Sequence, residues 1–197
     1  ISRDDEAVVL ILTEYSNSLQ RISKQLEKLL ETIARLRREG RAVSEIDLFR
    51  EVRYQQFIAQ LRQEMTDYAR FVSSTVSTVQ KEAIATAFEQ ADAVFKFIYS
   101  DLPDETVKAF ARFDEYSARN ITAKLNNEEY LKALTGKFEP LTLLGVKEVL
   151  IDGTITGRSV KDIKADLIKR FEIVPQRAET IARTEVISAY REGNLER

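Results

Sequence analysis

The feature of this sequence that most constrains its fold is a run of apolar residues near the start, spaced alternately three and four positions apart. Its members are Leu12, Tyr15, Leu19, Ile22, Leu26, Leu29, Ile33 and Leu36. Residues spaced in this way fall on one face of an α-helix, as they do in a coiled coil. At 1.5 Å per residue the seam covers roughly 36 Å. The sequence therefore predicts a long helix whose apolar face must be covered by another helix.

A second helix with the same spacing is predicted after a short break. Gly40 is placed to end the first helix, and Ser44 with Asp47 has the pattern of a capping box. The second seam consists of Tyr54, Ile58, Leu61, Met65, Tyr68, Val72, Thr75 and Val79. Because two seams joined by a short turn are typical of an antiparallel hairpin, we expect two long antiparallel segments over residues 5–38 and 45–98.

Two features of this hairpin have alternative interpretations. The stretch VSSTVSTV at 72–79 is rich in β-branched residues and is compatible with a strand or a kink, but the unbroken spacing through it favours a helix. The first seam is compatible with packing inside the hairpin or between the subunits of a homo-oligomer. We favour packing inside the hairpin. The apolar face continues through Ala83, Ala87, Ala91, Val94 and Ile98.

Shorter helices are predicted before the last third of the chain. Pro103, followed by two acidic residues, has the pattern of a helix first turn. The apolar residues of that helix are Val107, Phe110, Ala111, Phe113, Ile121 and Leu125. A further short helix over 128–136 closes on Gly136.

The tail contains three helical segments with clear punctuation between them. Residues 153–157, GTITG, are predicted to form a turn, and Ser159 is predicted to cap the next helix together with Asp162. Pro175 opens the last helix, and Gly193 is placed to end it.

Composition agrees with helices and excludes several classes of function. The 197 residues are 44% apolar and 31% charged, with only 6 Gly and 3 Pro, so turns are few. We expect an all-α fold, with an elongated antiparallel helical hairpin or bundle over 1–138 and a small compact helical subdomain over 139–197. The chain has no Cys and no His, which excludes disulfides, Cys/His zinc sites and Ser-His-Asp triads. No Asp/Asn-rich loop has calcium-ligand spacing. We therefore expect no enzyme activity, no catalytic residue, no cofactor and no metal.

Charge and hydropathy limit the partners. The net charge is −2, so no global positive field attracts nucleic acid. The longest apolar run, residues 7–12, is too short to span a bilayer, and we expect no membrane partner. A local basic cluster at the predicted hairpin tip comprises Arg35, Arg37, Arg38 and Arg41. Such a cluster is either a solvated helix end, which we favour, or a contact for an anionic partner, which would be double-stranded DNA or the acidic surface of another protein.

One acidic residue in the last helix is unusual. Ala178, Ala182 and Ala189 fall on one narrow face, and Glu185 falls on the same face between them. A carboxylate on a face of small residues must be paired or hydrated. We expect Glu185 to be buried and joined to a cation, or to accept backbone N–H bonds from residues 153–159. The candidate cations are Arg158, Arg170 and Arg177.

The tail resembles the Mu F-like family of tailed-phage head morphogenesis proteins, also called minor head or minor capsid proteins. The family pattern is a turn with Gly, a short helix ending in an RF-like pair, and a helix that reads R-A-x-x-I-A-R-T-E before a small residue and a Gly. The matching residues are Gly157, Arg170, Phe171, Arg177, Ala178, Ile181, Ala182, Arg183, Thr184, Glu185, Ala189 and Gly193. The match extends over about 60 residues, and a long helical region before the motif is usual in the family.

The resemblance implies a function and a location. It implies a non-enzymatic minor head protein of the virion, bound to the portal protein and other capsid components at the portal vertex inside the capsid, and present in the host cytoplasm during assembly. Its role would be in head morphogenesis and in DNA packaging or ejection. The motif residues Arg177, Ile181, Ala182, Arg183, Thr184, Glu185 and Gly193 would have a structural role. Many members continue after the motif with a Trp and paired Cys and His residues, so we expect the 139–197 subdomain to be incomplete at its C-terminal end.

Two alternatives belong to other classes. The first is a DNA-binding internal protein that is ejected with the genome and uses the arginine-rich tip. The second is the targeting domain of a phage-derived polymorphic toxin. Steep salt dependence of DNA binding would favour the first, and a reading frame that continues into an enzyme domain would favour the second.

Overall fold

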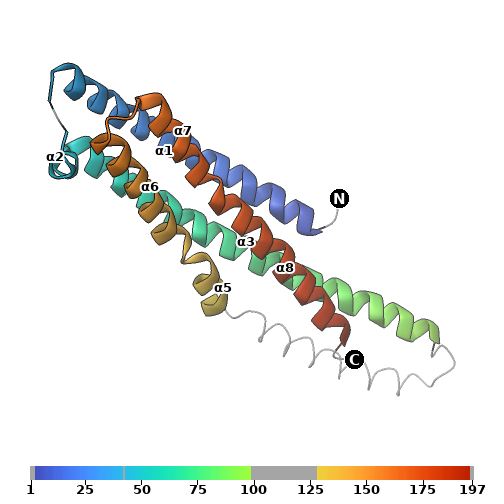
Figure 1. Cartoon of the computed structure of the whole chain (residues 1–197). Helices are drawn as coiled ribbons and strands as arrows, with labels where there is room; N and C mark the ends of the chain where they lie inside the picture. The colour runs from blue at the N-terminus through green and yellow to red at the C-terminus, as the bar shows by residue number, and fades with distance from the viewer. Residues whose placement is uncertain (1–2, 42, 99–127, 196–197) are drawn as a thin grey trace.

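The computed structural model describes residues 3–41, 43–98 and 128–195, and every regular element in these ranges is an α-helix (Figure 1). The helices are α1 (Arg3–Arg38), α2 (Glu45–Arg50), α3 (Val52–Ile98), α5 (Glu128–Thr135), α6 (Phe138–Ile155), α7 (Val160–Phe171) and α8 (Ile173–Leu195). The predicted all-α fold is confirmed. The helix expected from Pro103, with its apolar residues between 107 and 125, lies outside the described residues.

Three long helices, α1, α3 and α8, lie side by side and form the body of the bundle (Figure 1). α1 and α3 run antiparallel, as the two seams predicted, and α8 lies against both of them. The shorter helices cover this body: α6 packs on α3 and α7, while α5 packs on α3. The tail therefore lies along the hairpin.

The turn of the hairpin is built as its sequence predicts. Gly40 has a φ of 74°, the left-handed conformation that ends many helices. Ser44 and Asp47 form a complete capping box at the start of α2. Each backbone N–H of the pair is bonded by the other residue's side chain, so two of the backbone donors at the helix start are satisfied.

The second segment of the hairpin is divided at one residue. Glu51 has extended backbone (φ −68°, ψ 122°), which separates α2 from α3. The break turns the short helix α2 so that Leu48 is buried in the core. From Val52 onward the helix is continuous, and the β-branched stretch at 72–79 is helical, as its spacing predicted.

The main hydrophobic core contains side chains from every described helix. Near its middle, the ring of Tyr68 lies 5.1 Å from that of Tyr15 and 5.8 Å from that of Phe138, measured between ring centroids. The Tyr15 hydroxyl donates a hydrogen bond to the carbonyl of Phe171 at the end of α7. The described parts of 1–138 and 139–197 thus contribute to one continuous core.

The first seam packs within the chain, although its start is displaced by one residue. Five of its members are buried: Tyr15, Ile22, Leu26, Leu29 and Ile33. Leu12, however, is 39% exposed, whereas Ile11 is fully buried. Near its N-terminal end α1 faces α8 as well as α3, and Ala7 packs in a small cluster with Val186 and Ala189 of α8. The buried face is therefore turned toward α8.

The tail follows its predicted caps but differs in two turns. Ser159 accepts a hydrogen bond from the N–H of Asp162 over 3.1 Å, as predicted. Only the end of the predicted turn at 153–157 is a turn, because α6 continues to Ile155. Within these five residues, Gly157 is the one with a positive φ, of 69°. The helix α8 also continues through Gly193 to Leu195, since glycine weakens a helix without necessarily ending it.

Candidate functional site

The residues that carry the family resemblance in the last helix all lie on α8. Pro175 lies in its first turn, where its missing N–H is not needed. The stripe of Ala178, Ala182 and Ala189 is fully buried, as its spacing predicted. Small side chains on this face let α8 approach α3 and α1 closely. The alanines of the motif therefore form the buried face of α8, which packs against α3 and α1.

Glu185 is buried on the same inward face, with 9% of its surface exposed. Its carboxylate accepts a hydrogen bond from Nε2 of Gln80 on α3 and one from the hydroxyl of Tyr130 on α5, each over 3.3 Å. Three helices are thus joined at one carboxylate. The predicted burial of Glu185 is confirmed.

The predicted cation beside Glu185 is wrong for the described residues, since none of their Lys or Arg side chains pairs with it. Arg158 binds Asp166, Arg170 faces Glu148, and the Nε of Arg177 has no partner. Residues 153–159 do not donate to Glu185 either. The reason is distance along the bundle: Glu185 lies twelve residues into α8, or roughly 18 Å from the α7–α8 junction, at 1.5 Å per residue.

The surroundings of Glu185 favour its neutral form. Burial raises the pKa of Glu185, and the hydrogen bonds from Tyr130 and Gln80 only partly oppose that rise. The Oε1 of Gln80 is buried without a hydrogen-bond partner. Burial therefore makes ionisation of Glu185 less favourable in the folded chain than it is in water.

A second motif residue ties α8 to the start of α1. The guanidinium of Arg183 donates to Asp5 over 3.0 Å and to Glu179, one turn earlier on α8, over 3.1 Å. These side chains are partly exposed, so each pair contributes little by itself. Of the remaining motif residues, Ile181 and Ala182 are buried and Thr184 is exposed.

The arginines of the hairpin tip have different roles, and the idea of a uniform solvated cluster is wrong for Arg37. Its guanidinium donates to the carbonyls of Gly153, over 2.9 Å, of Thr154, over 3.2 Å, and of Arg158. These carbonyls lie at the end of α6 and in the turn after it, where a cation is favoured by the helix dipole. Arg37 therefore holds α1 against the α6–α7 turn.

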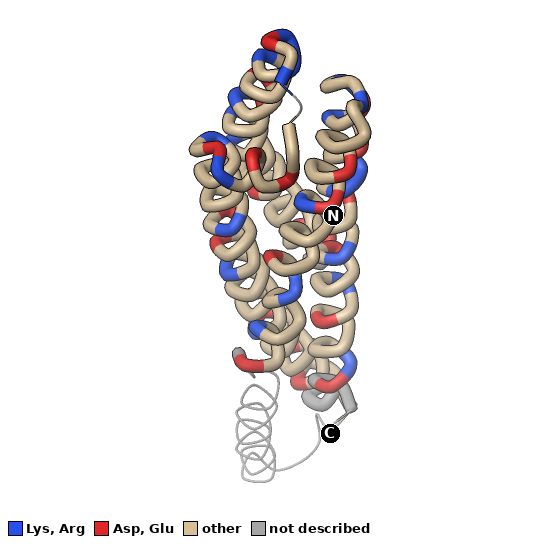
Figure 2. Tube along the Cα trace, turned by 60° about the vertical axis from the view of Figure 1, so that its left-hand side comes forward, with Lys and Arg blue, Asp and Glu red and all other residues tan. Residues whose placement is uncertain are grey.

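The other three tip arginines are exposed. Arg35 and Arg41 lie 4.0 Å and 3.9 Å from Glu39, and the Nε of Arg38 donates to the carbonyl of Ala34. Figure 2 shows Lys and Arg interspersed with Asp and Glu along the described bundle. The tip is thus a local cluster of arginines with an acidic residue among them.

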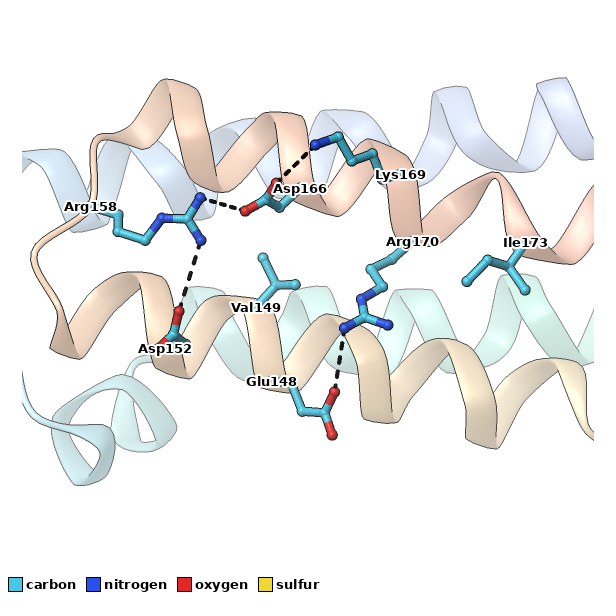
Figure 3. A pocket seen from close by; sticks show the side chains of 8 residues that line it. All are labelled: Glu148, Val149, Asp152, Arg158, Asp166, Lys169, Arg170 and Ile173. Carbon is cyan, nitrogen blue, oxygen red and sulfur yellow. Dashed lines mark hydrogen bonds and ion pairs between the residues drawn. The ribbon is translucent and has the colours of Figure 1, made fainter.

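A hollow of about 560 Å³ lies between α6 and α7 and is rimmed by charged side chains (Figure 3). Figure 3 shows Arg158, Asp166 and Lys169 along one side and Asp152, Val149 and Glu148 along the other. Arg158 binds Asp166 over 2.5 Å and lies 3.8 Å from Asp152. Lys169 lies 3.5 Å from Asp166, and Arg170 lies 3.7 Å from Glu148. The hydrogen bond from Arg158 lowers the pKa of Asp166.

Two glycines of α6 lie close to side chains of α7, and one of them, Gly153, allows the two helices to touch. A Cβ on Gly153 would lie 2.5 Å from Cγ1 of Ile163, so α6 and α7 touch at this point only because the residue is glycine. A Cβ on Gly145 would lie 3.2 Å from Cδ of Arg170, whose side chain crosses α6 there. Sequence reasoning placed Gly153 in a turn and missed this packing role. It also missed the hollow.

Metal-binding groups of acidic side chains and membrane-spanning helices are both absent from the described residues. No group of three or more acidic side chains within them is placed to hold a metal ion. Two acids at the hollow, Glu148 and Asp166, each lie beside an arginine, at 3.7 Å from Arg170 and 2.5 Å from Arg158 respectively. None of the described helices combines the length and apolar character needed to cross a membrane.

Comparison with known proteins gives no match: no family model, no curated protein and no solved structure is similar to this chain. The resemblance to the Mu F-like family thus depends on the motif residues alone.

Proposed function

We propose that this chain is a non-enzymatic minor head protein of a tailed phage, similar to the Mu F-like family, that binds the portal protein during head morphogenesis. The observation that supports this proposal is the position of the motif. Its inward residues Ala178, Ala182, Glu185 and Ala189 are buried where α8 packs against α3 and α1. A structural use of the motif agrees with what the resemblance to the Mu F-like family implies for these residues.

Cross-linking mass spectrometry of assembled heads tests the proposal. Procapsids and mature heads of the phage that encodes the chain would be treated with a lysine-reactive reagent. We expect cross-links from exposed lysines of α7, such as Lys161 and Lys164, to the portal protein. Absence of the chain from both particles, or its presence without any cross-link to a portal or capsid protein, would contradict the proposal.

Binding of double-stranded DNA is a second candidate, and the exposed Arg35, Arg38 and Arg41 favour it. If all three contact phosphates, the logarithm of the DNA association constant falls by about 2.7 for each tenfold rise in salt. Replacing the three by Gln would remove that slope. If the DNA association constant of the wild-type chain does not change with salt concentration, DNA is excluded as the partner of the hairpin tip. The engagement of Arg37 with the α6–α7 turn leaves it outside this set.

A further inference from the structure

The hollow between α6 and α7 continues along α6 toward the start of α8. A second hollow, of about 180 Å³, shares Glu148, Arg170 and Ile173 with the first. We call the two together the α6 groove. It follows α6 from Leu141 to Asp152, which corresponds to roughly 17 Å of helix. This length matches three turns of a bound helix.

The smaller hollow has an apolar floor and is open at the surface. Phe138 and Val174 are buried beneath it, whereas Leu141 is 48% and Leu144 is 58% exposed. Pockets for drug-sized ligands measure about 300–1,000 Å³. A hollow of 180 Å³ is below that range and is better suited to one large apolar side chain.

The charge on the groove is not balanced at this end. Arg158, Lys169 and Arg170 each lie within 4.0 Å of an acidic side chain. Arg177, which lines the smaller hollow, has a buried Nε without a hydrogen-bond partner, and none of the described acidic residues forms an ion pair with it. A half-buried guanidinium without a counterion favours a carboxylate, which its two Nη groups can bind through two parallel hydrogen bonds, since the buried Nε is out of reach of a ligand.

The outer face of α6 extends the apolar surface beside the groove. Leu141, Leu144, Ile151 and Ile155 follow the spacing of a helix seam, with Glu148 at the intervening position. Three of these four apolar side chains are exposed, and Ile151 is half-buried. An amphipathic helix that binds a groove is anchored by apolar side chains at positions i, i+3, i+4 and i+7. The apolar side chains on the outer face of α6 are spaced so that they can contact the apolar side chains of such a helix.

We propose that the α6 groove binds an acidic amphipathic helix of a partner protein. The partner helix places one large apolar side chain in the 180 Å³ hollow and a carboxylate on Arg177. The hollow has room for one large apolar side chain of the partner helix. The unpaired guanidinium of Arg177 favours an acidic residue beside that side chain. This inference is independent of the proposed function, because it concerns the chemistry of the partner and not the particle in which the two proteins meet.

Fluorescence anisotropy with a synthetic probe tests the proposal on the whole chain. The probe is a labelled, side-chain-stapled helix of about 14 residues, with Leu at i, i+3 and i+7 and Glu at the flanking positions. We expect it to bind the wild-type chain, and we expect Arg177→Gln and Leu144→Ser each to weaken binding at least about tenfold. Hydrogen exchange should show protection along α6 when the probe is bound.

Two controls separate binding from folding and from charge. Arg191→Gln changes an exposed arginine elsewhere on α8 and should leave binding unchanged. A probe with Lys in place of Glu should not bind. The variants would be compared by circular dichroism, and Leu144→Ser is expected to keep the fold because its side chain is already exposed.

Three outcomes would overturn the proposal. The first is failure of the acidic probe to bind, and the second is equal binding by the wild-type chain and both variants. The third is concentration-dependent dimerisation of the chain that Leu144→Ser abolishes, which would assign the groove to a second copy of this chain. The cross-linking test of the head protein is independent of all three, so either proposal can fail alone.

Discussion

Nε2 of Gln80 on α3 donates to Oε2 of Glu185 on α8 across 3.3 Å, and no described cation pairs with that carboxylate. The contact joins the family-like motif to the middle of the hairpin. A buried carboxylate that is held only by neutral donors is costly to ionise, because each lost interaction with water is poorly replaced. Stability should therefore depend on the protonation of Glu185.

The first prediction concerns pH. The pKa of Glu185 is raised in the folded chain, so its contribution to the free energy of unfolding is fully present below the ordinary pKa of 4.5 and is lost as pH rises through the folded value. Glu185→Gln removes this titration while keeping the shape of the side chain. As pH rises from 4.5 to neutrality, we expect the wild-type chain to lose stability relative to Glu185→Gln. The melting temperature of the variant minus that of the wild-type chain should therefore increase with pH. A difference that is constant with pH would contradict the assignment.

Truncation of the same residue gives a second prediction. Glu185→Ala leaves the amide of Gln80 without its partner, and the loss should be about 1–3 kcal/mol in the free energy of unfolding. This is less than the roughly 3–5 kcal/mol lost on breaking a buried ion pair, because no charge is stranded. Glu179→Ala is the control, since its pair with Arg183 is partly exposed. Urea unfolding would show whether the two substitutions differ as expected.

The third prediction separates a structural role of Arg37 from a role in DNA binding. Arg37→Gln removes charge-assisted hydrogen bonds to three carbonyls at the α6–α7 turn. We expect it to lower the free energy of unfolding by about 2–4 kcal/mol. Arg38→Gln, at an exposed position next to it, should change stability by less than about 0.5 kcal/mol. Equal melting temperatures for the two variants would show that Arg37 is not a structural residue.

The fourth prediction compares two glycines of α6. Gly153→Ala places a methyl group against Ile163, where the two helices touch, and should cost about 1–3 kcal/mol. Gly145→Ala meets only the flexible chain of Arg170 and should be neutral or stabilise the helix by up to about 1 kcal/mol. Thermal melts of the pair would measure the difference. A stabilised Gly153→Ala variant would contradict the close approach of α6 and α7.

The fifth prediction tests the displaced seam. Ile22 is fully buried, so Ile22→Ala should cost about 2–5 kcal/mol. Leu12 has the same place in the sequence pattern but is exposed, so Leu12→Ala should cost less than about 1 kcal/mol. Similar losses in urea unfolding would indicate that Leu12 is covered, as it would be in an intermolecular coiled coil.

What the sequence by itself determined were the features that depend on neighbours within a turn or two of helix. The 3-4 seams predicted the long antiparallel helices, and the capping residues Ser44 and Ser159 were identified from partners three positions away. The burial of the alanine stripe on α8 followed from helical periodicity alone. Each of these predictions needs only the geometry of a single helix.

The tertiary structure alone decided which side chains meet across the bundle. Glu185 binds Gln80, 105 residues away, and Arg37 binds carbonyls more than 100 residues away, so no spacing in the sequence reveals either contact. These pairings depend on how each helix is rotated about its axis, and a rotation of about 100° exchanges one residue for the next. That rotation buried Ile11 in place of Leu12, and it is set by the packing of α1 against α3 and α8 together.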